Sequence, residues 1–391
     1  MPGGDLNIVK VSTLLNTILG QARLNPAAVV DTSSFVSVAQ TALKCKPDVL
    51  LESLSQMFTN RDIVSMRPYT RKFRGLERTD EEWGNAVRKF SYVDSDMETN
   101  PAWDLTDGQS VDMYKVIKPT VLQTNFYGQA TWEQEFSVFD YQLNIAFSNP
   151  YSFQNFMAGM YQNKADQREQ AHEALARATI LNLIAGVISG NTKDGVVKVL
   201  TLYNTQNGNE APLTKADVMK SENFPDFLRF FVATLKIYLK LMSERSQKFQ
   251  INVDGKAITR HTPREDVMMY LYTPFFEKAK TMVYGDIFHD SYMDFGNYEE
   301  VNFWQSINDT QKINVNAAYT DATGAVKNKA TTNENVLGII FDREAAGYNS
   351  IINRTWTTPY NGKGAYTNNG ISFSDRYYND FTEKAIVFTL E

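Results

Sequence analysis

The chain has 391 residues, a formal net charge of −6, a pI of about 5.4 and one cysteine, Cys45. The acidic balance excludes the broad basic face that tight nucleic-acid binding requires, because such binding displaces counterions from phosphates. A single cysteine excludes an internal disulfide and favours a reducing compartment. Hydrophobic residues make up 43% and aromatics 13%, so the chain can bury large cores, and its length predicts two or three lobes.

The sequence shows no sign of export or of membrane insertion. The opening residues PGGDLNIVKVS lack the charged start and apolar core of a signal peptide. The most apolar stretch, ATILNLIAGVIS, is short for a bilayer span and is interrupted by Asn182. We therefore expect a protein without a membrane partner that is made in a cytoplasm.

Residues 1–60 are predicted to form short helices joined by proline-containing breaks. In KPDVLLESLSQMF the apolar side chains fall on one helical stripe, namely those of Leu50, Leu51, Leu54, Met57 and Phe58. Such short helices cannot bury this stripe against one another, so we expect them to lie on a larger body or on a neighbouring copy.

Residues 61–148 have a strand-like texture and segregated charge. VIKPTVLQTNFYG and TWEQEFSVFDYQLNIAF are rich in β-formers, and Asp107-Gly108 marks a turn. Residues 61–78 hold six Lys/Arg against two acids, whereas residues 79–112 hold nine acids against two bases. Segregated charge suits docking on a complementary copy, although a solvated strand face explains it equally well. The candidate subunit-interface residues are Arg67, Arg71, Lys72, Arg74, Arg78, Asp80, Glu81 and Glu82.

A long helix is predicted over residues 149–189. Asn149 is a good N-cap and Pro150 suits the first helical position, and apolar residues then recur at spacings of three and four. At 1.5 Å per residue this helix is about 55–60 Å long. Its middle, residues 162–173, is polar nearly all round, so we expect His172 there to lie at the surface.

The following segments predict a mixed α+β lobe. GVVKVLTLYNT reads as a strand followed by a hairpin-type Asn207-Gly208, a second helix begins near Pro225, and Asp254-Gly255 marks a tight turn. In REDVMMYLYTPFFEKAKTMVYG a strand feeds a helix that begins at Thr273-Pro274 and ends at Gly285. A strand leading directly into a helix favours the α+β class.

Two buried-type strands close the sequence, ENVLGIIFDREAAG and EKAIVFTL. Asn361-Gly362 and Asn369-Gly370 are predicted tight turns between them. Ile386, Phe388 and Leu390 alternate toward one face, so the last strand should be an integral part of a sheet.

Residues that carry catalysis are scarce. The three histidines have no ligand spacing, and no nucleophile elbow occurs. DSDMETN resembles the opening of a calcium loop but has Thr99 where glycine is needed and Leu105 where the bidentate glutamate belongs. We therefore expect no catalytic, metal or cofactor site. The alternative is a soluble two-domain carbohydrate-binding protein or hydrolase that uses an aromatic groove.

The order of these parts resembles the major capsid proteins of tailed bacteriophages, which share the Hong Kong 97-type fold. The texture is closest to the small short-tailed phages. The likeness covers nearly the whole chain in architecture. It is specific in residues over about 336–390, where VLGIIFDREAAGYNSIINRTWTTPYNGKGAYTNNGISFSDRYYNDFTEKAIVFTL is similar to the closing region of such proteins.

The resemblance implies a division of the chain into capsid-protein parts. These are an N-terminal arm (1–60), an extended loop or E-loop with flanking strands (61–148), a peripheral domain (149–253) with its spine helix (149–189), an axial domain (254–375) and a C-terminal strand returning to the sheet (376–391). It also implies a structural, non-enzymatic role.

The resemblance further implies partners. Copies of the chain would form the hexamers and pentamers of an icosahedral shell around double-stranded DNA, which the shell touches weakly and without sequence specificity. A scaffolding protein and a portal protein at one vertex would take part. Assembly would occur in the host bacterial cytoplasm, and the product would be the virion capsid.

Overall fold

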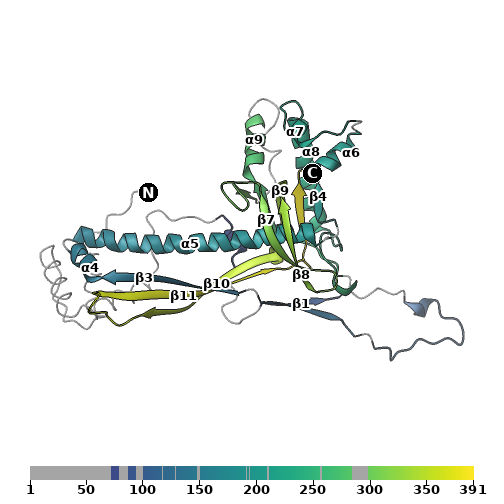
Figure 1. The fold of residues 1–391 in the computed structure, drawn as a ribbon. Helices are drawn as coiled ribbons and strands as arrows, with labels where there is room; N and C mark the ends of the chain where they lie inside the picture. The colour runs from purple at the N-terminus through teal and green to yellow at the C-terminus, as the bar shows by residue number, and fades with distance from the viewer. Residues whose placement is uncertain are drawn as a thin grey trace. The chain divides into compact units, whose positions relative to one another are not determined.

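The computed structural model describes residues 72–78, 87–93, 100–116, 118–127, 129–147, 150–190, 192, 194–208, 211–255, 258–283 and 298–391 (Figure 1). The described residues belong to two compact units. The first contains residues 129–174 and 349–376, and the second contains residues 72–128, 175–348 and 377–391. The predicted N-terminal helices of residues 1–60 lie outside the described residues.

The chain combines α-helices with strands, and from residue 313 to residue 389 strands follow one another without an intervening α-helix, as in the α+β class. The α-helices are α4 (Asp140–Ala146), α5 (Pro150–Ser189), α6 (Val199–Gln206), α7 (Lys215–Val218), α8 (Phe224–Ser243) and α9 (Thr273–Val283). Short 3-10 helices are η1 (Arg74–Leu76), η2 (Pro101–Trp103), η3 (Val253–Gly255), η4 (Arg264–Asp266) and η6 (Arg343–Ala345). The strands are β1 (Val87–Tyr92), β2 (Val121–Phe126), β3 (Gln129–Phe139), β4 (Val196–Lys198), β5 (Val267–Tyr272), β6 (Glu299–Val301), β7 (Ile313–Thr320), β8 (Val326–Asn333), β9 (Val336–Asp342), β10 (Ala346–Thr357), β11 (Tyr366–Asn379) and β12 (Ala385–Thr389).

Helix α5 confirms the predicted long helix, with Pro150 in its first turn, where a missing N–H is tolerated. The expectation for its middle is wrong in one respect, because His172 is only 4% exposed. A polar side chain on a helix can thus be covered by packing that the periodicity does not reveal. Among the described helices only Gln162–Ser189 is long and apolar enough to cross a membrane, and 61% of its apolar window is buried, as in an ordinary core helix.

The first unit contains a three-stranded sheet in the order β10-β11-β3. β11 and β3 are antiparallel, with Tyr366 opposite Phe139 and Arg376 opposite Gln129. One face of β3 packs on α5, where Lys164 Nζ lies 5.1 Å from the Phe136 ring centroid. Alternate side chains of β3 therefore meet the helix, as period-two strand geometry requires.

The predicted turn at Asn369-Gly370 is wrong, because both residues lie inside β11. A Cβ atom at Gly370 would come within 2.4 Å of the Trp356 ring. The glycine is needed here to let an indole lie against the backbone, a role that in sequence looks the same as a turn.

The second unit is built on a five-stranded sheet in the order β4-β12-β9-β5-β6. β12 pairs parallel with β4 and antiparallel with β9, so the predicted integral C-terminal strand is confirmed. All five residues of β12 are buried, because it is a central strand covered on both faces. A two-stranded ribbon, β7–β8, completes this unit.

Helix α8 covers one face of this sheet. The ring centroids of Phe231 and Tyr238 lie 6.0 and 5.8 Å from that of Phe388 in β12, both in edge-to-face geometry. α9 joins the same core through Phe275, 5.7 Å from Phe231. The predicted strand-to-helix step at Thr273 is confirmed as β5 leading into α9.

Between β4 and α8 the structure corrects the predicted long strand and hairpin. β4 has only three residues, and α6 begins at Val199 because the buried side chains of Val199, Leu200 and Tyr203 follow helical spacing. Gly208, with φ of 58°, follows the end of this helix and does not form a hairpin turn.

Candidate assembly interface

Three of the eight predicted interface residues can be placed. Lys72, Arg74 and Arg78 are described, whereas Arg67, Arg71, Asp80, Glu81 and Glu82 lie outside the described residues. Lys72 Nζ donates to the Glu300 carbonyl at 3.2 Å, and the Arg78 guanidinium donates to the Arg343 carbonyl. Arg74 and Lys72 are exposed. Lys72 and Arg78 therefore bind carbonyl groups within the second unit, whereas Arg74 faces solvent.

Two apolar residues between these cations fix the segment in place. Phe73 and Leu76 are 1% and 0% exposed. The Phe73 ring lies 5.0 Å from that of Tyr270, and the Arg177 guanidinium lies 5.0 Å above its face. The charge pattern predicted from the sequence did not reveal these anchors, although Phe73 and Leu76 form an apolar pair three residues apart within a basic run.

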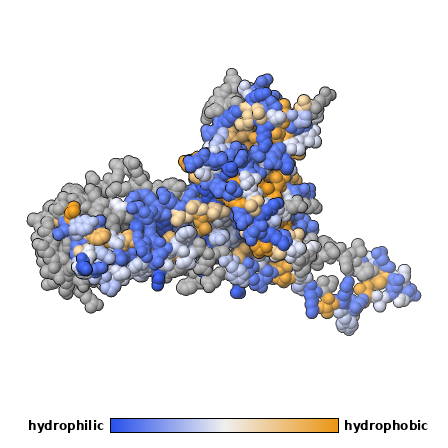
Figure 2. All heavy atoms as spheres, viewed as in Figure 1, coloured by the Kyte–Doolittle hydropathy of each residue, from blue (hydrophilic) through white to orange (hydrophobic). Residues whose placement is uncertain are grey.

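β1 and β2 form an antiparallel ladder from which a long excursion, residues 93–120, leaves and returns (Figure 1). Residues 102–116 of this excursion are exposed and include large apolar side chains: Trp103 (89% exposed), Met113 (80%), Tyr114 (80%) and Val116 (78%). In Figure 2 apolar spheres appear along this segment at the lower right. An apolar set of this kind on a surface marks a contact with another molecule.

Local hydrogen bonds shape the part of the excursion from 100 to 116, which we call the tip. The Asn100 Oδ1 atom accepts from Ala102 N at 2.9 Å at the start of η2. Gln109 N donates to the Thr106 carbonyl at 3.0 Å across a turn that has Gly108 at φ of 88°. The predicted Asp107-Gly108 turn is thus confirmed. These bonds hold the Trp103 side chain outward on an ordered turn.

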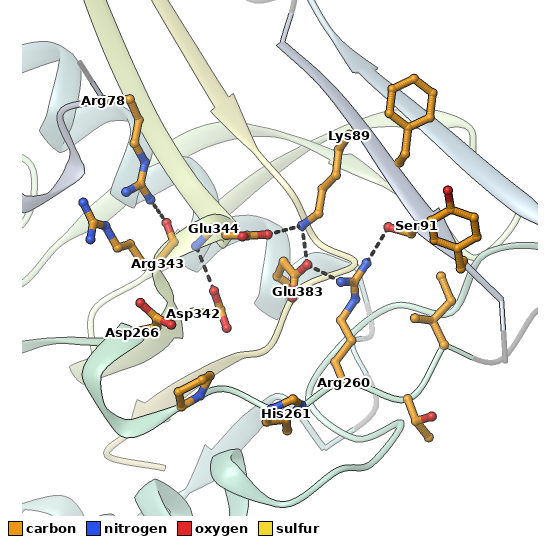
Figure 3. A pocket seen from close by; sticks show the side chains of 15 residues that line it. Arg78, Lys89, Ser91, Arg260, His261, Asp266, Asp342, Arg343, Glu344 and Glu383 are labelled. Atoms are coloured by element: carbon orange, nitrogen blue, oxygen red, sulfur yellow. Dashed lines mark hydrogen bonds and ion pairs between the residues drawn. The ribbon is translucent and has the colours of Figure 1, made fainter. Parts of the chain in front are cut away.

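The base of β1 is held by a buried cluster of charges (Figure 3). Lys89 Nζ lies 3.0 Å from a carboxylate oxygen of Asp380, 3.0 Å from one of Glu344, and in direct contact with Glu383. The Asp380 and Glu383 side chains are only 2% and 5% exposed. Breaking such a cluster by removing its cation is strongly destabilising, because buried carboxylates then lose their partner.

A second cation joins this cluster to β1. The Arg260 guanidinium contacts Glu383 and donates to the Ser91 hydroxyl at 2.9 Å. Two successive inward side chains of β1, Lys89 and Ser91, are therefore bound to the body of the second unit.

Burial and charge act in opposite directions in this cluster. Burial disfavours the charged form of Lys89, but the carboxylates of Asp380 and Glu383 outweigh it and raise the pKa of Lys89. Burial raises the pKa of Glu383 to about 7, although Lys89 and Arg260 both favour its charged form. Glu383 consequently changes charge near neutral pH.

A groove of about 630 Å³ lies beside this cluster. One wall is formed by Phe90 and Tyr92, which are 58% and 68% exposed, and much of the remaining lining is charged, including Arg260, Arg343 and Glu344 (Figure 3). Within the described residues, no group of three or more His, Cys, Asp or Glu side chains could hold a metal ion. The groove combines aromatic walls with paired charges, a composition suited to a protein partner.

Solved structures with a similar fold come from bacteriophages. A chain from the capsid of Staphylococcus phage Andhra matches with a TM-score of 0.54 and 12% identity, covering 85% of this chain and 87% of that one. A chain from a structure of native bacteriophage P68, described as head fiber and inner core protein, matches with a TM-score of 0.53 and 10% identity, covering 85% and 88%. At this identity the likeness establishes the fold, and it confirms the predicted α+β phage capsid architecture.

Sequence comparison then gives the family. Residues 60–389 match the model of the Phi29-like phage major capsid protein family, so the chain belongs to that family. A search of curated proteins finds no match. The protein is therefore a structural, non-enzymatic major capsid protein of the virion shell, and the alternative of a carbohydrate-binding protein or hydrolase is dropped.

Proposed function

We propose that copies of this chain form the hexamers and pentamers of an icosahedral head that encloses double-stranded DNA. We further propose that the excursion between β1 and β2 lies on a neighbouring copy. The observation that carries this proposal is the exposed apolar set headed by Trp103, at 89% exposure, on a segment whose base is held by the ion pairs of Lys89. Covering that set by a second copy removes apolar surface from water.

Charge supports a weak contact with DNA. A net charge of −6 gives no reason for the inner wall to hold the genome tightly, and a strongly basic wall would impede its movement. Packaged DNA would then be touched without sequence specificity. The proposal also includes two protein partners, a scaffolding protein and a portal protein at one vertex. Assembly would take place in the host bacterial cytoplasm.

The division into parts is proposed with the boundaries given above: the arm (1–60), the extended loop (61–148), the peripheral domain (149–253), the axial domain (254–375) and the closing strand (376–391). The long helix and the final strand support two of these parts. α8 packs on the five-stranded sheet through Phe231 and Phe388, so the boundary near 253 is the one to test first.

Negative-stain microscopy of the expressed chain, with and without a co-expressed scaffolding protein, tests the proposal. We expect closed shells or ring-shaped capsomers. A lasting monomer under both conditions, at concentrations well above those of assembly, would refute it.

The predicted charged segment has its own test. Reversing Arg71, Lys72 and Arg74 to Glu should block assembly while the circular dichroism spectrum stays that of the parent chain. Arg74 contributes most clearly, because it is exposed, whereas Lys72 already donates to the Glu300 carbonyl of its own chain. Normal shells from the triple variant at low and moderate salt would remove these residues from the interface.

A further inference from the structure

The two edges of the β7–β8 ribbon differ in how they are covered (Figure 1). On β7, the Asn182 side-chain amide binds both backbone groups of Ala318: its Nδ2 donates to the carbonyl at 2.9 Å, and its Oδ1 accepts from the N–H at 2.8 Å. The Gln305 amide binds both backbone groups of Asn314 in the same way, at 3.0 and 2.7 Å. An amide that donates and accepts together replaces two bonds that a further strand would make. The edge of β7 is therefore closed at two positions.

The edge of β8 has no such cover. Ala318 lies opposite Asn328, and directly opposite residues of an antiparallel pair point their backbone groups either both toward each other or both away. Since the groups of Ala318 point away from β8 to meet an amide, those of Asn328 point away from β7, as do those of the alternate residues along the strand. These outward residues are Val326, Asn328, Ala330 and Thr332. Within the described part of the chain, their outward N–H and carbonyl groups have no hydrogen-bond partner.

Another molecule can reach this edge. Residues 326–330 are exposed. β8 contains neither a proline nor a bulge, two devices with which natural proteins close an edge. The edge strands β4 and β6 of the five-stranded sheet have only three residues each, whereas β8 has eight. A ribbon of two strands is only marginally stable by itself, so a third strand on β8 would stabilise it.

The charges beside this edge determine which kind of strand it favours. Lys327 Nζ lies 3.7 Å from a carboxylate oxygen of Asp321 in an exposed pair, and within the described residues Lys329 forms no ion pair. A second copy of β8 would bring its own lysines beside these, and like charges on neighbouring strands oppose pairing. A strand with Glu or Asp at alternate positions would instead bring opposite charges beside them.

The described strands of this chain do not supply such a segment. Among them only β3 has acids at alternate positions, Glu133 and Glu135. Both belong to contacts within their own unit, because Glu133 Oε1 accepts from Trp356 Nε1 at 2.5 Å and the Glu135 carbonyl accepts from Lys164 Nζ at 3.2 Å. β3 is also paired along its whole length with β11. The acidic strand therefore has to come from a different protein.

We propose that the edge of β8 binds an extended acidic segment of a different protein, which joins the ribbon as a third strand. Hydrogen bonds to the outward backbone groups supply the affinity, and carboxylates beside Lys327 and Lys329 supply the preference for an acidic sequence. The inference goes beyond the proposed function, because it concerns a partner other than the chain itself. It applies to the free chain as well as to a shell.

Hydrogen exchange with a peptide probe tests the site on the free, full-length chain. The probe is acetyl-Thr-Glu-Val-Glu-Val-Glu-Thr-amide, and the matched control peptide carries Lys in place of each Glu. With the acidic probe at about ten times its dissociation constant, exchange of the outward amides of β8 should slow about tenfold. Mass spectrometry of the fragment that covers residues 326–332 measures this. The lysine peptide should leave exchange unchanged.

Two variants separate the backbone contribution from the charge contribution. Ala330→Pro removes one outward N–H and no bond to β7, and should weaken binding of the acidic probe about fivefold. Its matched control is Asn316→Pro, at the opposite residue of β7, which should leave binding unchanged. Lys329→Glu should weaken the acidic probe about fivefold. Lys363→Glu, at an exposed lysine in a turn of the first unit, is the control for charge.

The possible outcomes divide as follows. Protection by the acidic probe alone, weakened in both β8 variants, supports the inference. Equal protection by both peptides, or none by the acidic probe, overturns it. Protection that rises with chain concentration without any probe places a second copy on the edge and also overturns it. If Ala330→Pro does not fold, the comparison of Lys329→Glu with Lys363→Glu decides. None of these results requires a shell, so the proposed capsid function stands or falls separately.

Discussion

Replacement of Lys89 by Met should loosen the base of the excursion more than any change on its exposed length. The side chain of Lys89 is 18% exposed and contacts Asp380 and Glu383, which are 2% and 5% exposed. Removing one partner of a buried ion pair typically costs about 3–5 kcal/mol. We expect a loss of this size in the free energy of unfolding of the second unit at pH 8.

The same variant has a predicted pH dependence. Burial raises the pKa of Glu383 in the folded protein to about 7 from an ordinary value of 4.5. The folded protein therefore binds the proton more tightly than the unfolded chain, so the contribution of Glu383 to stability is present at low pH and is lost as the pH rises from 4.5 to 7. At pH 5 Glu383 is protonated and neutral, so the loss of the Lys89 ammonium group leaves no unpaired charge on Glu383. The cost of Lys89→Met should then fall toward the roughly 1–3 kcal/mol of one unsatisfied buried group.

Urea unfolding at pH 5 and pH 8, followed by hydrogen exchange on β1 and β2, measures both quantities. The matched control is Lys327→Met, because Lys327 pairs with Asp321 at 3.7 Å on the exposed β7–β8 ribbon and should lose less than about 0.5 kcal/mol. If Lys89→Met stays within 0.5 kcal/mol of the parent at pH 8, the cluster does not hold the excursion and the reasoning fails.

Three further outcomes are expected. Deleting residues 383–391 should abolish soluble folded protein, because β12 is a central strand; soluble expression and circular dichroism check this, and a folded truncation would refute it. Phe388→Ala should cost about 3–5 kcal/mol in urea unfolding, since its ring is fully buried against α8, and a cost below about 1 kcal/mol contradicts that packing. Gly370→Val should cost about 1–3 kcal/mol through contact with Trp356, measured as the shift in thermal midpoint against Gly362→Val, where an added Cβ makes only an ordinary contact with Tyr360 at 3.9 Å.

The long periodic elements of the fold could be predicted from the sequence because their signals are local. Pro150 and the apolar spacing after it predicted α5, and the apolar run before Thr273 predicted β5 and α9. The predictions were wrong where the same local sequence pattern is compatible with two kinds of secondary structure. Val199 begins a helix within a run of β-formers, and Gly370 serves packing in a strand although Asn-Gly is typical of a turn.

The candidate interface was only half visible in the sequence. The charge runs directed attention to residues 61–112, but the cluster at the base of β1 joins Lys89 to Glu383, 294 positions along the chain. No spacing rule connects such residues before the fold is known. The exposure of Trp103 could not be predicted either, because an aromatic residue in a strand-like region is ordinarily expected in a core.

The place of β12 in its sheet bears on the order of events in building a shell. Its parallel partner β4 lies about 190 residues earlier in the chain, and long-range pairing of this kind makes folding slow. Newly made subunits therefore pass through a stage in which the five-stranded sheet is incomplete and apolar segments are exposed. At this stage they can associate non-specifically with one another. Cooler growth or helper proteins that delay such encounters should raise the yield of correctly closed particles.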